Sequence, residues 1–185
     1  MQTLIKPLDF LCPRLDGRTI CLRPLEARDF DGLLLAASDP EIWRQHSEPN
    51  RYRPEIFRKF FDKALVAPRA LVIIEKATGL IIGSTRYYDF DEVMQKVTSG
   101  YTFLMCKYWG GVTNRELKGL VLNHAFGFVN KVIFHASEGN IRSRRSLERL
   151  GAQQKPGLFD IPGIGTRVEY TLTRQQWAAI NRIEG

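Results

Sequence analysis

The chain has 185 residues, a formal net charge of +7 and 44% apolar residues. This length and composition indicate one globular domain with its own core, and they exclude fibrous and extended disordered proteins. The charge favours polyanionic partners such as RNA or a phosphate-rich cofactor, but a solvated basic surface explains it equally well. Cys12, Cys21 and Cys106 are far apart and lack metal-ligand spacing, which excludes the usual zinc sites and disulfide frameworks.

The N-terminal part of the sequence predicts one strand followed by two helices. We expect an N-terminal arm over residues 1–16 and a first strand over Thr19–Leu25. Apolar residues at helical spacing predict a helix over Glu26–Ser38, stopped by Asp39-Pro40, and a second helix over Pro54–Leu65.

The middle of the chain predicts three antiparallel strands. Ala70–Glu75 and Leu80–Asp89 flank a turn at Thr78-Gly79 and therefore form a hairpin, with Gly83 as the candidate bulge. A third strand over Val97–Cys106 runs directly into two glycines.

The C-terminal part predicts alternating helices and strands. Its expected elements are a helix over Asn114–Val129, a strand over Lys131–Ser137, a helix from Asn140 that closes at Gly151, a strand around Arg167–Thr173 and a short helix through Trp177 and Ile180. The element order predicts an α/β or α+β fold, in which helices flank a mixed, mostly antiparallel central sheet. No apolar segment reaches membrane-spanning length and the N-terminus is broken by charges and prolines, so we expect a cytoplasmic protein.

The glycine loop is the first candidate site. Gly110 and Gly111 follow a strand and precede a helix, where unpaired N–H groups and the helix dipole stabilise a bound phosphate. Taken alone, the two glycines fit a plain turn equally well, and their spacing matches neither a P-loop nor a dinucleotide fingerprint.

The helix that starts after Asn140 is the second candidate site. Ser143 shares a helical face with Leu147 and Leu150, so a hydroxyl lies on the inward stripe. That hydroxyl either bonds within its own helix or contacts a ligand and delivers a proton. The arginines of this helix suit a solvated face or a nucleotide phosphate; they are Arg142, Arg144, Arg145 and Arg149. His124, on the apolar stripe of the preceding helix, is expected to be a packed core histidine.

Together these segments resemble the GNAT acetyltransferase superfamily, and within it the branch of ribosomal-protein N-terminal acetyltransferases. The resemblance covers most of the chain. It rests on Gly17-Arg18 to Pro24, Arg28-Asp29, Gly79, Ile82-Gly83, Ser99-Gly100-Tyr101, Tyr108-Trp109-Gly110, Asn114-Arg115-Glu116, His124-Ala125-Phe126 and Asn140 to Ala152. The last run is the most specific, because its asparagine, serine, basic pair and terminal Leu-Gly recur at this spacing in that branch.

The resemblance implies an N-acetyltransferase with acetyl-CoA as co-substrate, in which a primary amine attacks the thioester directly. Ser143 would protonate the departing thiolate, and backbone N–H groups of a splayed strand would stabilise the oxyanion. The residues implied in holding acetyl-CoA are Phe103, Leu104, Met105, Gly110, Gly111, Val112, Thr113, Asn114, Arg115, Asn140 and Arg145. Because no covalent intermediate is expected and Cys106 has no activating neighbour, a structural role is favoured for this cysteine.

Two features stay open at this point. Val112 stands where relatives usually carry glycine, and a β-branched residue resists positive φ. Either Gly111 has taken over that conformation or cofactor binding is weakened. The general base is a bound water or one of four side chains, namely Asp89, Asp91, Glu92 and His135.

The acceptor implied by the branch is a protein N-terminus, with a small amine or an antibiotic as alternatives. A different class of function is a non-catalytic GNAT-fold module that binds RNA or an acidic partner, which Val112 and the net charge support. The aromatic residues lie mostly at periodic, apolar positions and are not interleaved with basic ones, so we favour the enzyme and expect no nucleic-acid partner. Whether two chains form a homodimer stays open.

Overall fold

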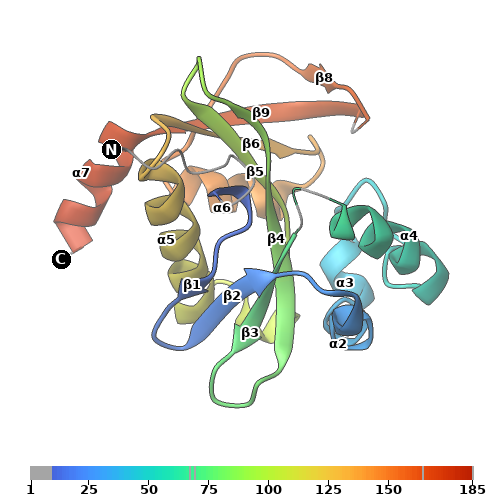
Figure 1. The fold of residues 1–185 in the computed structure, drawn as a ribbon. Coiled ribbons are helices and arrows are strands. Elements are labelled where there is room, and N and C mark those ends of the chain that lie inside the picture. Colours follow the sequence, from blue (N-terminus) through green and yellow to red (C-terminus); the bar gives the residue numbers. More distant parts are fainter. Residues whose placement is uncertain (1–9, 67, 69, 164, 185) are drawn as a thin grey trace.

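The computed structural model of the chain describes residues 10–66, 68, 70–163 and 165–184. Within these residues the sheet has nine strands in the order β1-β2-β3-β4-β5-β6-β9-β7, with β8 paired to β9 off this path (Figure 1). The strands are β1 (Leu15–Asp16), β2 (Ile20–Pro24), β3 (Leu71–Glu75), β4 (Ile81–Asp91), β5 (Lys96–Leu104), β6 (Lys131–Ala136), β7 (Gln153–Gln154), β8 (Phe159–Ile161) and β9 (Gly165–Thr173). All pairs are antiparallel except β5–β6, which is parallel. The predicted fold class is therefore confirmed.

Helices cover both faces of this sheet (Figure 1). They are η1 (Ala27–Asp29), α2 (Phe30–Ala36), α3 (Pro40–Trp43), α4 (Pro54–Leu65), η2 (Cys106–Tyr108), α5 (Val112–Phe126), α6 (Ile141–Arg149) and α7 (Arg174–Glu184). Successive side chains of β3 point to opposite faces of the sheet, as they do along any strand. Val72 packs in the core under α2, α3 and α4, whereas Ile73 packs in the core under α5, α6 and α7. No helix of the described residues is long and apolar enough to cross a membrane.

The predicted helix over Glu26–Ser38 was wrong in detail. A 3-10 turn, η1, comes first, and α2 then ends at Ala36. Asp39-Pro40 also has a second role: it stops one helix and starts another, because the Asp39 carboxylate accepts a hydrogen bond from the Glu41 N–H and caps α3. Four residues are too few to show a helical period, so α3 was not predicted.

Other predicted boundaries moved by a few residues. The expected arm over residues 1–16 is partly core, since Phe10 and Leu11 are buried and Leu15–Asp16 form β1; residues 1–9 lie outside the described residues. The expected bulge in β4 is confirmed beside Gly83, where Ile82 is the extra residue between two β3 partners. A side chain at Gly83 would overlap the carbonyl of Phe103 on β5, so glycine is needed for this close approach.

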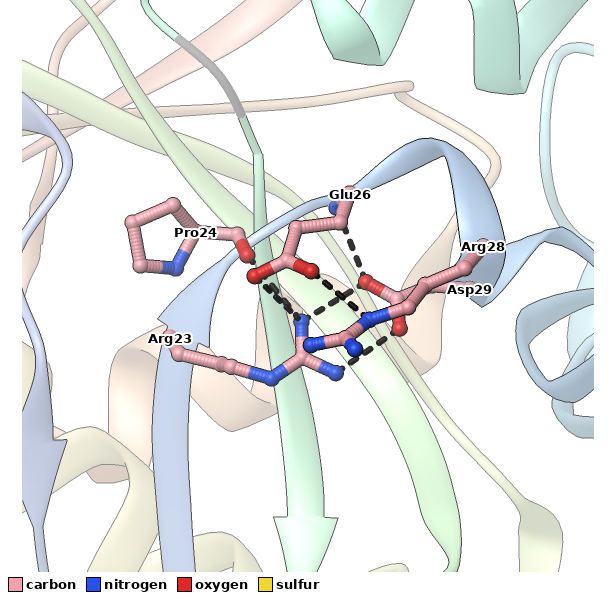
Figure 2. Close-up of polar contacts among 5 residues, drawn as sticks. All are labelled: Arg23, Pro24, Glu26, Arg28 and Asp29. Carbon is pink, nitrogen blue, oxygen red and sulfur yellow. Dashed lines mark hydrogen bonds and ion pairs between the residues drawn. The ribbon is translucent and has the colours of Figure 1, made fainter.

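A buried ion pair joins the end of β2 to the first helical turn (Figure 2). The Arg23 guanidinium donates to both carboxylate oxygens of Asp29 at 2.7 Å, and the Glu26 N–H donates to the same carboxylate at 2.8 Å. Burial opposes ionisation of Asp29, but the hydrogen bonds from Arg23 and Glu26 outweigh it and hold the pKa of this carboxyl below its ordinary value. The pair therefore fixes where the chain leaves the sheet to form α2, α3 and α4.

Candidate active site

A groove opens where β5 and β6 separate. The two strands pair only from Lys96–Thr98 to Lys131–Ile133, and no register continues beyond those residues in the described strands. The groove has a larger compartment of about 480 Å³ and a smaller one of about 180 Å³. Residues that line both compartments are Trp43, His46, Thr102, Lys118, Asn140, Ser143 and Leu147. The separation that the resemblance implied for β5 is thus present.

The β5 wall contains a second bulge. The register with β4 shifts between Ser84 and Arg86, and Tyr101 at this point has a φ of 52°, which is uncommon for a residue with a side chain. Phe103 and Leu104, which the resemblance implies in holding acetyl-CoA, line the smaller compartment. Met105 does not, because it follows the strand and its N–H donates to the carbonyl of Ile82. The Leu104 carbonyl is also occupied, by the indole N–H of Trp109 at 2.9 Å.

The glycine loop supplies the N-terminus of α5. Gly110 has a φ of +66°, Gly111 is the extended N-cap, and Val112 is already in the first helical turn with an exposed side chain. Gly110 and not Gly111 therefore takes the left-handed conformation, and Val112 needs no such strain. The Arg115 N–H bonds to Gly111, but no described residue accepts a hydrogen bond from the N–H groups of Val112, Thr113 or Asn114. These are the unpaired donors of a helix start.

Of the loop residues expected to hold the co-substrate, Gly110 and Asn114 line the smaller compartment. The others do not line either compartment; they are Gly111, Val112, Thr113 and Arg115. The backbone of the first turn, more than its side chains, is what the loop offers to a ligand.

The start of α6 forms the opposite wall. The Asn140 side chain accepts a hydrogen bond from the Ser143 N–H at 3.1 Å and caps the helix, as predicted. The Ser143 hydroxyl makes no hydrogen bond with any described residue, and Ser143 lines both compartments together with Leu147. The alternative of bonding within the helix finds no support, and the hydroxyl is available to a ligand.

The arginines of α6 divide into two groups. Arg142 and Arg149 line the smaller compartment, whereas Arg144 and Arg145 line neither. Arg142 lies 3.8 Å from the Trp109 ring and donates to the Ile42 carbonyl at 2.7 Å, so it ties α6 to the loop after β5 and to α3. The seven-residue spacing of Arg142 and Arg149, two turns on one helix face, is the signal that sequence analysis missed.

Lys118 lies at the junction of the two compartments. It projects from α5 one turn after Asn114, and its ammonium is 5.8 Å from the Phe134 ring. No described carboxylate pairs with it. Burial lowers the pKa of Lys118 to about 8. No motif or spacing around Lys118 in the sequence predicts that it lines the groove.

The larger compartment carries two histidines. His46 accepts a hydrogen bond from the Glu48 N–H on Nδ1, and burial together with three nearby arginines lowers the pKa of His46 to about 3. Such an imidazole is neutral at pH 7 but too weak a base for efficient proton abstraction. His135 has Nε2 3.3 Å from the Glu169 carboxylate and Nδ1 3.3 Å from the Tyr88 hydroxyl.

The remaining candidates from the sequence lie away from the groove. Asp89, Asp91 and Glu92 line neither compartment. His124 has Nε2 2.9 Å from the Phe10 carbonyl and its ring stacks on Phe10, as expected for a packed histidine. Burial and then Asp39 raise the pKa of Cys106 to about 11, which agrees with the predicted structural role for this thiol.

Comparisons with known proteins agree with this geometry. Residues 19–153 match the family described as Acetyltransferase (GNAT) domain. A GCN5-related N-acetyltransferase from Brucella melitensis superposes with a TM-score of 0.80 at 20% identity, over 92% of this chain and 82% of that one. A putative acetyltransferase from T. thermophilus has a TM-score of 0.73 at 27% identity, over 92% and 95% of the two chains. Mycobacterium smegmatis RimJ, solved with CoA-disulfide, has a TM-score of 0.64 at 15% identity, over 92% and 94%, and shows the fold alone. No curated protein sequence matched.

Proposed function

The chain belongs to the GNAT acetyltransferase family and is an N-acetyltransferase that uses acetyl-CoA; on this premise we propose that it acetylates the primary amine of a protein N-terminus in the groove between β5 and β6. The ribosomal-protein branch that the sequence resembles supports the choice of a protein N-terminus. The groove and its unpaired donors support direct attack of the amine on the thioester.

The observation that carries the proposal is a helix start with unpaired N–H groups beside a compartment that is lined in part by Phe103, Leu104 and Trp109. The first turn of α5 has unpaired N–H groups, and of this segment Gly110 and Asn114 line the smaller compartment, where Arg149 adds a positive charge. These groups suit a pyrophosphate. Phe103, Leu104 and Trp109 line the same compartment and suit a pantetheine arm. The residues present therefore fit acetyl-CoA.

The chemistry divides between the two compartments. Acetyl-CoA supplies the activated acetyl group as a thioester. In our proposal the amine enters through the larger compartment and gives its proton, by way of the Tyr88 hydroxyl, to Nδ1 of His135, whose ring Glu169 orients. The C–N bond forms as the C–S bond breaks; Ser143 would donate a proton to the departing thiolate and regain one from solvent, and His135 would release the proton of the amine to solvent.

Titration calorimetry with acetyl-CoA tests the co-substrate site. We expect saturable one-to-one binding with a micromolar dissociation constant. An absence of this binding, together with salt-sensitive binding of an RNA oligonucleotide, would support a non-catalytic module instead.

Arg149→Ala and Arg145→Ala form a matched pair, because the same charge is removed one helical turn apart. We expect Arg149→Ala to weaken acetyl-CoA binding about tenfold, since a charge-assisted contact to phosphate is lost, and the loss should shrink at high salt. Arg145→Ala should change the dissociation constant less than about twofold. If Arg145→Ala weakened acetyl-CoA binding more than Arg149→Ala, the phosphate contact would be assigned to Arg145, the residue that the resemblance implied.

Ser143→Ala tests the proton donor. We expect kcat to fall about 10- to 100-fold while the dissociation constant for acetyl-CoA stays nearly constant, because a general acid acts in the transition state. Ser146→Ala, at the smaller compartment alone, is the control and should leave kcat nearly unchanged. Equal turnover of Ser143→Ala and the unmodified enzyme would remove the assignment.

A further inference from the structure

The larger compartment contains arginines without a carboxylate partner. Arg51 and Arg167 both line it, and no described carboxylate lies within ion-pair distance of either guanidinium. Four arginines outside the compartment do have carboxylate partners among the described residues, as Arg23 has Asp29 and Arg44 has Glu41. Arg51 and Arg167 instead face a compartment that could receive a negatively charged group.

Arg51 is held in place by aromatic rings. Its guanidinium carbon lies 5.1 Å from the Trp43 ring and 4.6 Å from the Phe60 ring. Burial lowers the pKa of Arg51 to about 10, Glu48 partly offsets that lowering, and Arg167 adds to it. The guanidinium lies 3.2 Å from the His46 ring, but no described carboxylate is in direct contact with it. A guanidinium that is partly removed from water favours a bound anion, so its position facing a compartment indicates a ligand that completes the pair.

Arg167 approaches the compartment from β9. One of its nitrogens donates to the Ser47 hydroxyl at 3.1 Å and another to the Thr166 carbonyl at 2.7 Å, which orients the guanidinium. The charged side chains that line the compartment include Arg51, Arg167 and Lys118 against a single carboxylate, Glu48. The net charge of the side chains around the acceptor is therefore positive.

We propose that the acceptor carries a carboxylate close to its reacting amine, and that Arg51 and Arg167 bind this carboxylate. The inference rests on the proposed acetyl transfer. Guanidinium groups match carboxylates in geometry and can bind them with two parallel hydrogen bonds. The carboxylate is either the α-carboxylate of a free amino acid or an Asp or Glu side chain at the start of a peptide. A polycationic amine would meet like charges and be disfavoured.

The test compares acceptors that differ in one charge. With saturating acetyl-CoA, release of free coenzyme A thiol is measured for peptides beginning with Asp or Glu against those beginning with Asn or Gln, and for free amino acids against their amides. A polyamine such as spermidine is the cationic control. We expect kcat/KM to be at least about tenfold higher for the carboxylate member of a pair. Preference within the peptide pairs assigns the side chain and keeps the protein N-terminus as the acceptor. Preference within the amino-acid pairs assigns the α-carboxylate and replaces the protein N-terminus with a free amino acid, while acetyl transfer stands.

Variants locate the recognition. Arg167→Gln and Arg51→Lys should each reduce the preference for the carboxylate several-fold, whereas Arg14→Gln, an exposed arginine outside both compartments, should not. Thermal melts check that each variant is folded. Active enzyme that treats acid and amide alike, or a preference that survives both substitutions, would overturn this inference and leave acetyl transfer intact. Transfer to no amine at all, despite bound acetyl-CoA, would overturn the proposed function and this inference with it.

Discussion

Asp29→Ala is expected to lower the free energy of unfolding by about 3 kcal/mol, because it removes the close two-oxygen partner of the buried Arg23 guanidinium and leaves it only the more distant, partly exposed carboxylate of Glu26 at 3.9 Å. Arg23 is largely buried and Asp29 almost entirely so, which prevents water from replacing the lost carboxylate. The substitution also removes the acceptor of the Glu26 N–H at the entry to η1. Urea denaturation of the two proteins measures the loss.

Arg28→Ala is the matched control, since Arg28 pairs with Glu26 at the exposed edge of the same cluster (Figure 2). It should cost less than about 1 kcal/mol. The sign of the pH dependence follows from the pKa of Asp29, which is held below the ordinary 3.8. The contribution of this carboxylate to stability is therefore complete above pH 3.8 and is lost as the pH falls through the lowered pKa. Acidification should therefore narrow the gap between the unmodified protein and Asp29→Ala. A cost for Asp29→Ala no larger than that for Arg28→Ala would contradict the account.

Elements with a long periodic pattern were predictable from the sequence, and contacts between distant segments were not. Pro54–Leu65 was bounded correctly because proline, apolar spacing and length agree there. Arg23 is a basic residue among apolar neighbours in the first predicted strand, but its partner Asp29 depends on how a 3-10 turn folds back over the strand end. No periodicity encodes that contact.

The same division holds for the groove. Asn140 and Ser143 were predicted because capping and the four-residue spacing are local properties of one helix. His46 and Arg51 were missed, because both lie between α3 and α4 and reach the compartment only after those helices pack against β5. The conformation at Val112 was likewise undecided, since only the loop geometry shows that Gly110 absorbs the positive φ.

Lys118→Met is expected to raise stability and slow catalysis together. Burial holds the pKa of Lys118 at about 8 against an ordinary 10.5, so the unfolded chain binds more protons between these values and the charged side chain opposes folding below them. Methionine keeps the apolar length without the charge and should stabilise the protein by about 1–3 kcal/mol at pH 7. The gain should fade as the pH rises from about 8 to 10.5. Urea denaturation at pH 7 and pH 10 measures it, with Lys59→Met on the exposed face of α4 as the control.

A destabilising lysine persists at such a position when its charge is used. Its side chain lines both compartments, where the proposed transfer would develop negative charge on the thioester oxygen and sulfur. We therefore expect kcat of Lys118→Met to fall about tenfold or more, with acetyl-CoA binding little changed. Steady-state kinetics measures the change in kcat, and urea denaturation of the same variant measures the change in stability. A variant that is more stable and fully active would show that the charge contributes nothing to turnover, and a variant that is less stable would show that Lys118 makes packing contacts worth more than its desolvation.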